Sequence, residues 1–149
     1  MSLGVGDKAP LFSLPSDDGG TVALKDLKGQ NVVLYFYPKD DTSGCTAEAC
    51  AFRDALPDFS KVKATVLGVS RDSVASHDKF KTKYKLPFPL LCDTTKAMSM
   101  AYGAAADASA KYPDRVTYVL AADGTVESAE KVTDIAAHVD AAVAKLRDV

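Results

Sequence analysis

The feature that most constrains the fold is a run of six apolar or aromatic residues, Val32 to Tyr37. A run of this kind predicts a strand that is fully buried. A polar loop and a segment with helical periodicity follow it, and Thr65 to Val69 form a second apolar run. A strand, a helix and a strand within about forty residues form a right-handed parallel unit. The chain is therefore predicted to have an α/β fold with this first strand in its sheet.

The segment between these two strands has the pattern of a helix with one buried face. The apolar residues that recur at helical spacing are Ala49, Phe52, Leu56 and Phe59. Pro57 lies in the same segment, and we expect it to kink or break the helix because proline lacks a backbone N–H. Cys45 stands where the loop meets the helix, at the carboxyl end of a strand, which is a usual place for a functional site.

Shorter apolar runs and turns complete the predicted sheet. The predicted strands are residues 10–14, 21–24, 32–37, 65–69, 90–92, 116–120 and 125–128. Turn-forming residues at Ser16 to Gly20 and at Asp123-Gly124 indicate two β-hairpins, the first of them an addition at the N-terminus. We expect a central mixed sheet flanked by helices.

Three further helices are predicted. Ser73 is the expected N-cap of one, with His77 on its buried face, where a lone histidine usually has a structural role. Thr94 to Tyr102 form a short helix, and Thr133 or Asp134 caps the last one. The buried stripe of this last helix consists of Ile135, Val139, Ala142, Val143 and Leu146.

The composition indicates one soluble globular domain over residues 1–149, since 47% of the residues are hydrophobic and 26% are charged. The net charge of -2 and the lack of a long basic run do not favour nucleic acid or an anionic membrane as a partner. No stretch reaches the length of a membrane span, and no export signal is evident, so we expect a cytoplasmic location. The alanine-rich residues 103–114 have no clear period and are expected to form a mobile loop.

Two of the three cysteines, Cys45 and Cys50, lie close together at the predicted helix start. The free N–H groups and the dipole of a helix N-terminus favour a thiolate, so Cys45 is a candidate nucleophile. Residues five apart on an ideal helix have Cα atoms about 8.6 Å apart, whereas a disulfide needs less than about 7 Å. A bond between these cysteines therefore requires the helix start to unwind, which suits a redox cycle better than a permanent crosslink. Three cysteines are also too few for a secreted disulfide scaffold.

Residues 32–54, which read VVLYFYPKDDTSGCTAEACAFRD, resemble the active-site segment of the peroxiredoxin Q, or bacterioferritin comigratory protein, family. The family pattern Pro-x-x-x-Thr-x-x-Cys falls on Pro38, Thr42 and Cys45, and its resolving cysteine falls on Cys50. The distal active-site arginine of the family falls on Arg115, directly before a predicted strand. Further similarity extends over nearly the whole chain.

The resemblance implies a thioredoxin-like fold and a thiol peroxidase acting on hydrogen peroxide or organic hydroperoxides. Cys45 would attack the peroxide and become a sulfenic acid, and Cys50 would then form an intramolecular disulfide with it. The resemblance implies thioredoxin as the reductant of this disulfide, favours a monomer, and calls for no metal or organic cofactor. Ser43 stands where the family usually has a proline, which makes the loop less rigid.

The resemblance also suggests roles for the residues around Cys45. The Thr42 hydroxyl would orient the peroxide, while N–H groups at the helix start stabilise developing negative charge. Arg115 would hold the thiolate and a peroxide oxygen; taken alone, it would be assigned to the surface at a strand edge. Pro38, which has no N–H, would shield the thiolate from water. Glu48 either orients an arginine or is a solvated carboxylate in the first helical turn.

Other classes of protein fit the sequence less well. A dithiol-disulfide oxidoreductase on the same fold needs Cys-x-x-Cys, which is absent, and a zinc module needs paired ligand spacing, which is absent too. A non-catalytic binding or chaperone-like module of the same fold stays open, and would consume no peroxide. Cys92 is expected to be a small buried residue, although an approach to Cys45 in space stays open.

Overall fold

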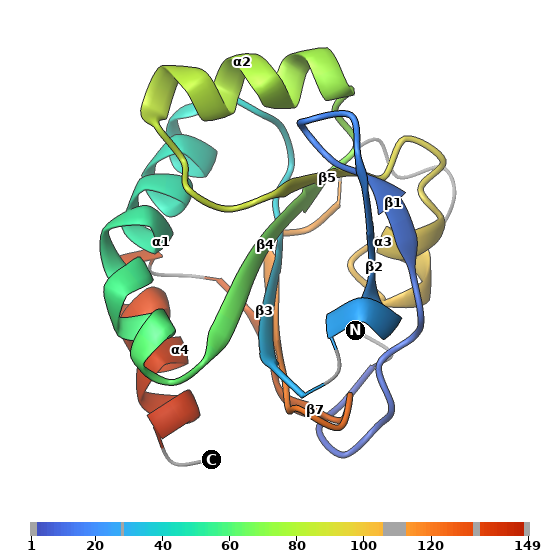
Figure 1. Ribbon diagram of the computed structural model, residues 1–149, viewed down its shortest axis with the longest axis vertical. Coiled ribbons are helices and arrows are strands. Elements are labelled where there is room, and N and C mark those ends of the chain that lie inside the picture. The colour runs from blue at the N-terminus through green and yellow to red at the C-terminus, as the bar shows by residue number, and fades with distance from the viewer. Residues whose placement is uncertain (1–2, 28, 106–112, 133–134, 148–149) are drawn as a thin grey trace.

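The computed structural model describes residues 3–27, 29–105, 113–132 and 135–147. Its centre is a five-stranded sheet in the order β5-β4-β3-β6-β7 (Figure 1). These strands are β5 (Leu90–Cys92), β4 (Ala64–Ser70), β3 (Asn31–Phe36), β6 (Val116–Leu120) and β7 (Val126–Lys131). β3, β4 and β5 are parallel, whereas β6 is antiparallel to β3 and β7 is antiparallel to β6. The predicted mixed sheet is confirmed.

β3 is buried on both faces, as its apolar run predicts. Val33 and Tyr35 belong to one apolar cluster, whereas Leu34 and Phe36 belong to another. The first cluster includes side chains of α1 (Ser43–Lys61) and α4 (Ile135–Arg147), and the second includes side chains of α3 (Ala97–Ala101). Figure 1 shows α1 and α4 on one face of the sheet, with α3 and the N-terminal hairpin on the other. Alternate side chains of one strand thus organise both halves of the core.

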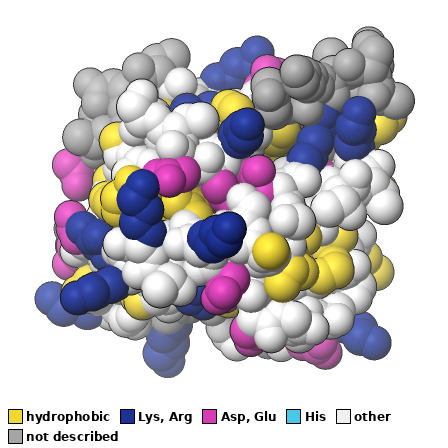
Figure 2. Space-filling model, turned by 90° about the horizontal axis from the view of Figure 1, so that it is seen from above, with side chains coloured by type: hydrophobic (Ala, Val, Ile, Leu, Met, Phe, Trp, Pro, Cys, Tyr) yellow, Lys and Arg dark blue, Asp and Glu magenta, His cyan; other side chains and the backbone are white. Residues whose placement is uncertain are grey.

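The N-terminal hairpin is confirmed with shorter strands than predicted, β1 (Ser13–Pro15) and β2 (Thr21–Ala23). A 3-10 helix, η1 (Leu24–Leu27), follows it. α2 (Val74–Tyr84) lies across the end of the sheet and begins at the predicted N-cap, where Ser73 Oγ accepts a hydrogen bond from the Ser76 N–H at 3.2 Å. Figure 2 views the molecule from this α2 end, where basic and acidic side chains are mixed on the surface.

Of the two outcomes expected for Pro57, a kink or a break, the break does not occur, because α1 continues through Pro57 to Lys61. Proline removes one intrahelical hydrogen bond. Phe52 and Phe59, on either side of Pro57, are fully buried, and α1 packs along α4. Packing of the apolar face of a helix contributes more to its stability than local propensity does, so it offsets the lost bond.

Some predicted features lie outside the described residues. These are the cap at Thr133 or Asp134 and most of the loop predicted at residues 103–114. Within the described part of the chain, no helix combines the length and the apolar character needed to cross a membrane.

Candidate active site

The loop from Pro38 to Thr42 joins the carboxyl end of β3 to the first turn of α1. Thr42 is the N-cap of α1, with an extended backbone at φ -88° and ψ 157°. Cys45 is the third residue of the helix, and only 1% of its surface is exposed. Its sulfur therefore lies in the first helical turn, where backbone N–H groups lack intrahelical partners.

Strand pairing brings Arg115 to the same place. β6 runs antiparallel to β3 with Phe36 opposite Val116, so the residue before β6 lies beside the end of β3. The Arg115 Nη2 group donates a hydrogen bond to Cys45 Sγ at 3.3 Å, and Nη1 donates to Glu48 Oε1 at 2.8 Å. The guanidinium thus links the sulfur to the carboxylate, and it stabilises negative charge on the sulfur.

Glu48 is fully buried one turn after Cys45. The alternative of a solvated carboxylate is therefore wrong, and the carboxylate orients Arg115. Burial raises the pKa of Glu48 to about 7, although the charge of Arg115 and its hydrogen bond oppose this shift. Burial also acts to lower the pKa of Arg115, but the charge of Glu48 raises it above its ordinary value. Glu48 Oε2 has no hydrogen-bond partner among the described residues.

Gly44 leaves space for the guanidinium of Arg115. A Cβ atom at this position would lie 2.9 Å from Arg115 Nη2, closer than such atoms approach in proteins. A glycine directly before Cys45 therefore permits the contact between Arg115 and the sulfur. This role of Gly44 could not be predicted from the sequence, because nothing local to the loop shows that a side chain 71 positions later covers it.

Pro38 and Thr42 are the first and last residues of the loop between β3 with Tyr37 and α1. The Thr42 side chain is exposed, and its hydroxyl donates to the Lys39 carbonyl at 3.0 Å, which anchors it within the loop. Pro38 follows Tyr37, the residue after the end of β3, and its side chain is half-buried. The predicted roles of both residues toward a substrate stay predictions.

All three cysteines are free thiols. Cys45 and Cys50 lie in one unbroken helix, with Cys50 half-buried. Cys92 lies on β5 and is buried as predicted, and burial raises the pKa of its thiol to about 11. Since the thiolate is the reactive form, Cys92 is a poor nucleophile near neutral pH.

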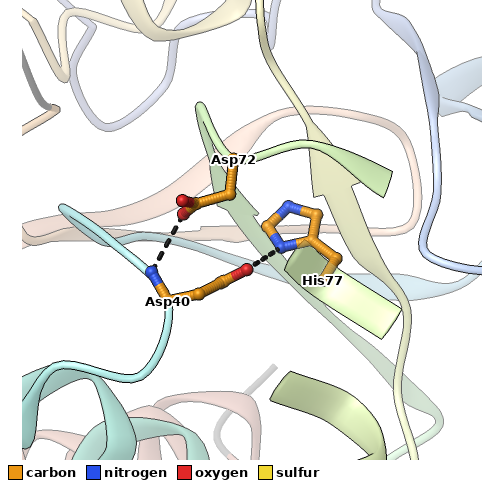
Figure 3. Close-up of side chains that lie close together, drawn as sticks. All are labelled: Asp40, Asp72 and His77. Atoms are coloured by element: carbon orange, nitrogen blue, oxygen red, sulfur yellow. Dashed lines mark hydrogen bonds and ion pairs between the residues drawn. The ribbon is translucent and has the colours of Figure 1, made fainter. Parts of the chain in front are cut away.

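Three side chains bring possible metal ligands within 4.8 Å of one another, namely Asp40, Asp72 and His77 (Figure 3). His77 Nδ1 lies 2.7 Å from Asp40 Oδ2, and Asp72 Oδ2 accepts from the Asp40 N–H at 2.9 Å. The two carboxylates and the imidazole are already engaged in these hydrogen bonds, so we assign the cluster to a polar network beside the loop. His77 is fully buried, in agreement with its predicted structural role, but its partner Asp40 was missed.

Comparison with known proteins gives consistent matches. Residues 5–129 match the model of the AhpC/TSA family. The chain is 45% identical to the putative peroxiredoxin bcp of Coxiella burnetii, over 98% of this chain and 100% of that protein. It is 49% identical to the chloroplastic peroxiredoxin Q of Oryza sativa subsp. japonica over 122 residues, which are 82% of this chain but only 56% of the rice protein.

Solved structures agree with these matches. Peroxidoxin BcpB from Mycobacterium tuberculosis superposes with a TM-score of 0.92 at 34% identity, covering 99% of this chain and 98% of that one. The bacterioferritin comigratory protein of Xanthomonas campestris, studied for its alkyl peroxide reduction activity, superposes with a TM-score of 0.86 at 37% identity, covering 92% and 90%. The predicted thioredoxin-like peroxiredoxin fold is thereby confirmed.

Gly44→Ala should separate the reactivity of Cys45 from the stability of the fold. The added methyl group would displace the end of a flexible arginine side chain, whereas alanine favours the helix by about 1 kcal/mol over glycine. We expect the rate of Cys45 oxidation by hydrogen peroxide to fall roughly 10²-fold, as for a lost preorganised donor. Stopped-flow oxidation and urea unfolding measure the two effects. Ser43→Ala, an exposed change in the same turn, is the matched control, and equal oxidation rates in both variants would contradict the expectation.

Glu48→Gln should change how stability depends on pH. The pKa of Glu48 lies near 7 in the folded protein and 4.5 ordinarily, so the folded state holds the proton more tightly. The stabilisation of the folded state by this tighter proton binding is complete below pH 4.5, and it is lost as pH rises through about 7. The free energy of unfolding of the wild type should therefore fall relative to Glu48→Gln across this window, by up to about 1.4 kcal/mol per pH unit. Urea unfolding of both proteins at several pH values tests this, and parallel curves would argue against it.

Proposed function

Because the chain belongs to the AhpC/TSA family, with bcp and peroxiredoxin Q relatives, we propose that it is a thiol peroxidase in which Cys45 reduces hydroperoxides. The observation that carries this proposal is the pair of hydrogen bonds from Arg115 to Cys45 Sγ and Glu48 Oε1. They hold a cation beside a buried sulfur in a first helical turn. This arrangement stabilises the thiolate and offers N–H donors to an oxygen bound beside it.

The first step is a two-electron oxidation of Cys45. The thiolate sulfur attacks one peroxide oxygen, so that an S–O bond forms and the O–O bond breaks. The second oxygen leaves with the electron pair and takes up a proton, as water from hydrogen peroxide or an alcohol from an alkyl hydroperoxide. Arg115, backbone N–H groups at the start of α1 and the Thr42 hydroxyl stabilise the departing charge in this proposal. Pro38 limits the access of water to the sulfur.

The second step uses Cys50 as the resolving thiol. Its thiolate attacks the sulfenic sulfur, an S–S bond forms, and the oxygen leaves as water after protonation. An external dithiol protein, thioredoxin by resemblance, then reduces the disulfide and restores both thiols. We further propose that residues 1–149 form one domain, which acts as a monomer in the cytoplasm.

Cysteine variants in a thioredoxin-coupled assay test this function. Cys45→Ser should abolish peroxide consumption, since a serine hydroxyl stays protonated where the thiolate is needed. Cys50→Ser should still form the sulfenic acid, which a dimedone-type reagent traps, but should lose recycling by thioredoxin. Cys92→Ser is the matched control and should keep the wild-type rate. A Cys45→Ser variant that keeps even a tenth of the activity would refute the assignment, and full turnover by Cys50→Ser would move the resolving role to another thiol.

Disulfide formation should unfold the start of α1. Cys45 and Cys50 lie in one continuous helix, where Cα atoms five residues apart are about 8.6 Å apart, beyond the reach of a disulfide. The oxidised protein should therefore show faster amide exchange over residues 42–53 and a lower melting temperature than the dithiol form. Ser43, in place of proline, leaves this segment freer to unwind. Equal exchange in both redox states, or an oxidised structure with an intact helix at 45–50, would be incompatible with this mechanism.

A further inference from the structure

The loop before Cys45 is held in place by the buried carboxylate of Asp40. The Asp40 side chain is 4% exposed and accepts hydrogen bonds from three groups. Tyr37 Oη donates to Oδ1 at 2.6 Å, Ser76 Oγ to Oδ2 at 2.8 Å, and His77 Nδ1 lies 2.7 Å from Oδ2. Two residues alone, Asp41 and Thr42, separate this anchored position from the first residue of α1.

The hydrogen bonds of His77 define its charge. Nδ1 faces the Asp40 carboxylate, and Nε2 lies 2.9 Å from the carbonyl oxygen of Leu91 on β5. A carbonyl oxygen can only accept, and a carboxylate with two other donors also accepts. With Asp40 ionised, both ring nitrogens carry hydrogen and the ring is an imidazolium. The result is a fully buried ion pair between the loop and the first turns of α2.

A second set of contacts ties the next loop residue to the same helix. Asp41 has φ +59°, a left-handed conformation that is unusual outside glycine. Its carboxylate accepts from Lys83 Nζ at 2.8 Å and from Tyr84 Oη at 2.9 Å. Arg53 of α1 in turn donates to the Tyr84 carbonyl at 2.7 Å. The α2 helix thus contacts the loop before Cys45 and the helix that follows it.

We infer that the charged Asp40–His77 pair positions the loop before Cys45. The pair thereby holds the start of α1 folded for the peroxide reaction, and it sets how readily the helix start unwinds for disulfide formation. The inference rests on the proposed function. The ion pair between Asp41 and Lys83 contributes less to holding the loop. These side chains are 43% and 57% exposed, so solvent screens their charges. Removing one member of a buried pair, by contrast, leaves the other charge without a partner.

The two chemical steps should respond in opposite directions when the pair is broken. Attack on peroxide needs Cys45, Arg115 and the helix start in fixed geometry, so loosening the loop slows it. Disulfide formation needs the helix start to unwind, so the same loosening speeds it. A shorter-lived sulfenic acid is also less exposed to further oxidation to the sulfinic acid. A lower rate of the first step with a higher rate of the second is the signature of this role.

Stopped-flow kinetics of His77→Gln and Asp40→Asn provide the test. We expect Cys45 oxidation to slow roughly tenfold, because small displacements of reacting groups are costly, and we expect disulfide formation to accelerate. Ser76→Ala removes one hydrogen bond to Asp40 and should shift both rates less, in the same directions. This milder variant decides the question should the other two fail to fold.

Val143→Ala is the matched control for a general loss of stability. Val143 is a core residue on α4, in the apolar cluster that also includes Phe52 of α1. It should lower the melting temperature while leaving the ratio of the two rates unchanged. A ratio in the Asp40, Ser76 and His77 variants equal to that in Val143→Ala would overturn the inference. The proposed function would survive that result, because it depends on the loss of activity in Cys45→Ser.

Nitrogen NMR of His77 is the second readout, since a role in packing alone does not require a charge. Burial lowers the pKa of His77, but the hydrogen bond that His77 donates to Asp40 and the charges of Asp40 and Asp72 raise it above its ordinary value. Tyr37, a further titratable neighbour, has its Oη 3.5 Å from Nδ1. We expect two protonated ring nitrogens at neutral pH, and a single protonated nitrogen in Asp40→Asn. A neutral imidazole in the wild type would overturn the inference.

Discussion

The antiparallel pairing of β6 with β3 is the interaction on which the site depends. Cys45 follows β3, and Arg115 precedes β6, so only opposite strand directions bring their side chains to one edge of the sheet. The register matters as much as the direction. A shift by one residue would turn every side chain of β6 to the other face. Burial of β6 and β3 on both faces, in two apolar clusters, holds this register.

Much of the fold could be predicted because its signals are local. Apolar runs, hairpin turns and the Ser73 cap each depend on neighbouring residues, and the structure has these elements within a few positions. The break that was one expectation for Pro57 does not occur, because packing of α1 on the sheet and on α4 outweighs the local effect of the proline. A rule about one residue predicts poorly where tertiary contacts dominate.

The candidate site was predictable only in part, and its missing members depend on distant contacts. The loop and helix around Cys45 carry their own pattern, but the partner of Asp40 lies 37 positions later and that of Gly44 lies 71 positions later. From the sequence, Glu48 could either orient an arginine or be solvated. Its full burial beside Arg115 decides for the first alternative. Asp40, Glu48 and His77 are buried polar groups, which add little net stability but restrict the chain to one arrangement.

The position of Phe52 limits how far the proposed redox cycle would disturb the protein. Phe52 follows Cys50 by two residues, is fully buried and stacks on Tyr35 of β3 with ring centroids 4.5 Å apart. Unwinding from Thr42 to Cys50 would release Cys45 and Ala49 from the core cluster, and unwinding beyond Cys50 would also have to release the larger Phe52. In the proposed cycle, α1 thus has a first segment that rearranges and a second segment that Phe52 anchors to the sheet. In the proposed cycle, a reductase would therefore meet the disulfide on a short unwound segment at the start of α1, directly before the part of the helix that Phe52 anchors to the sheet.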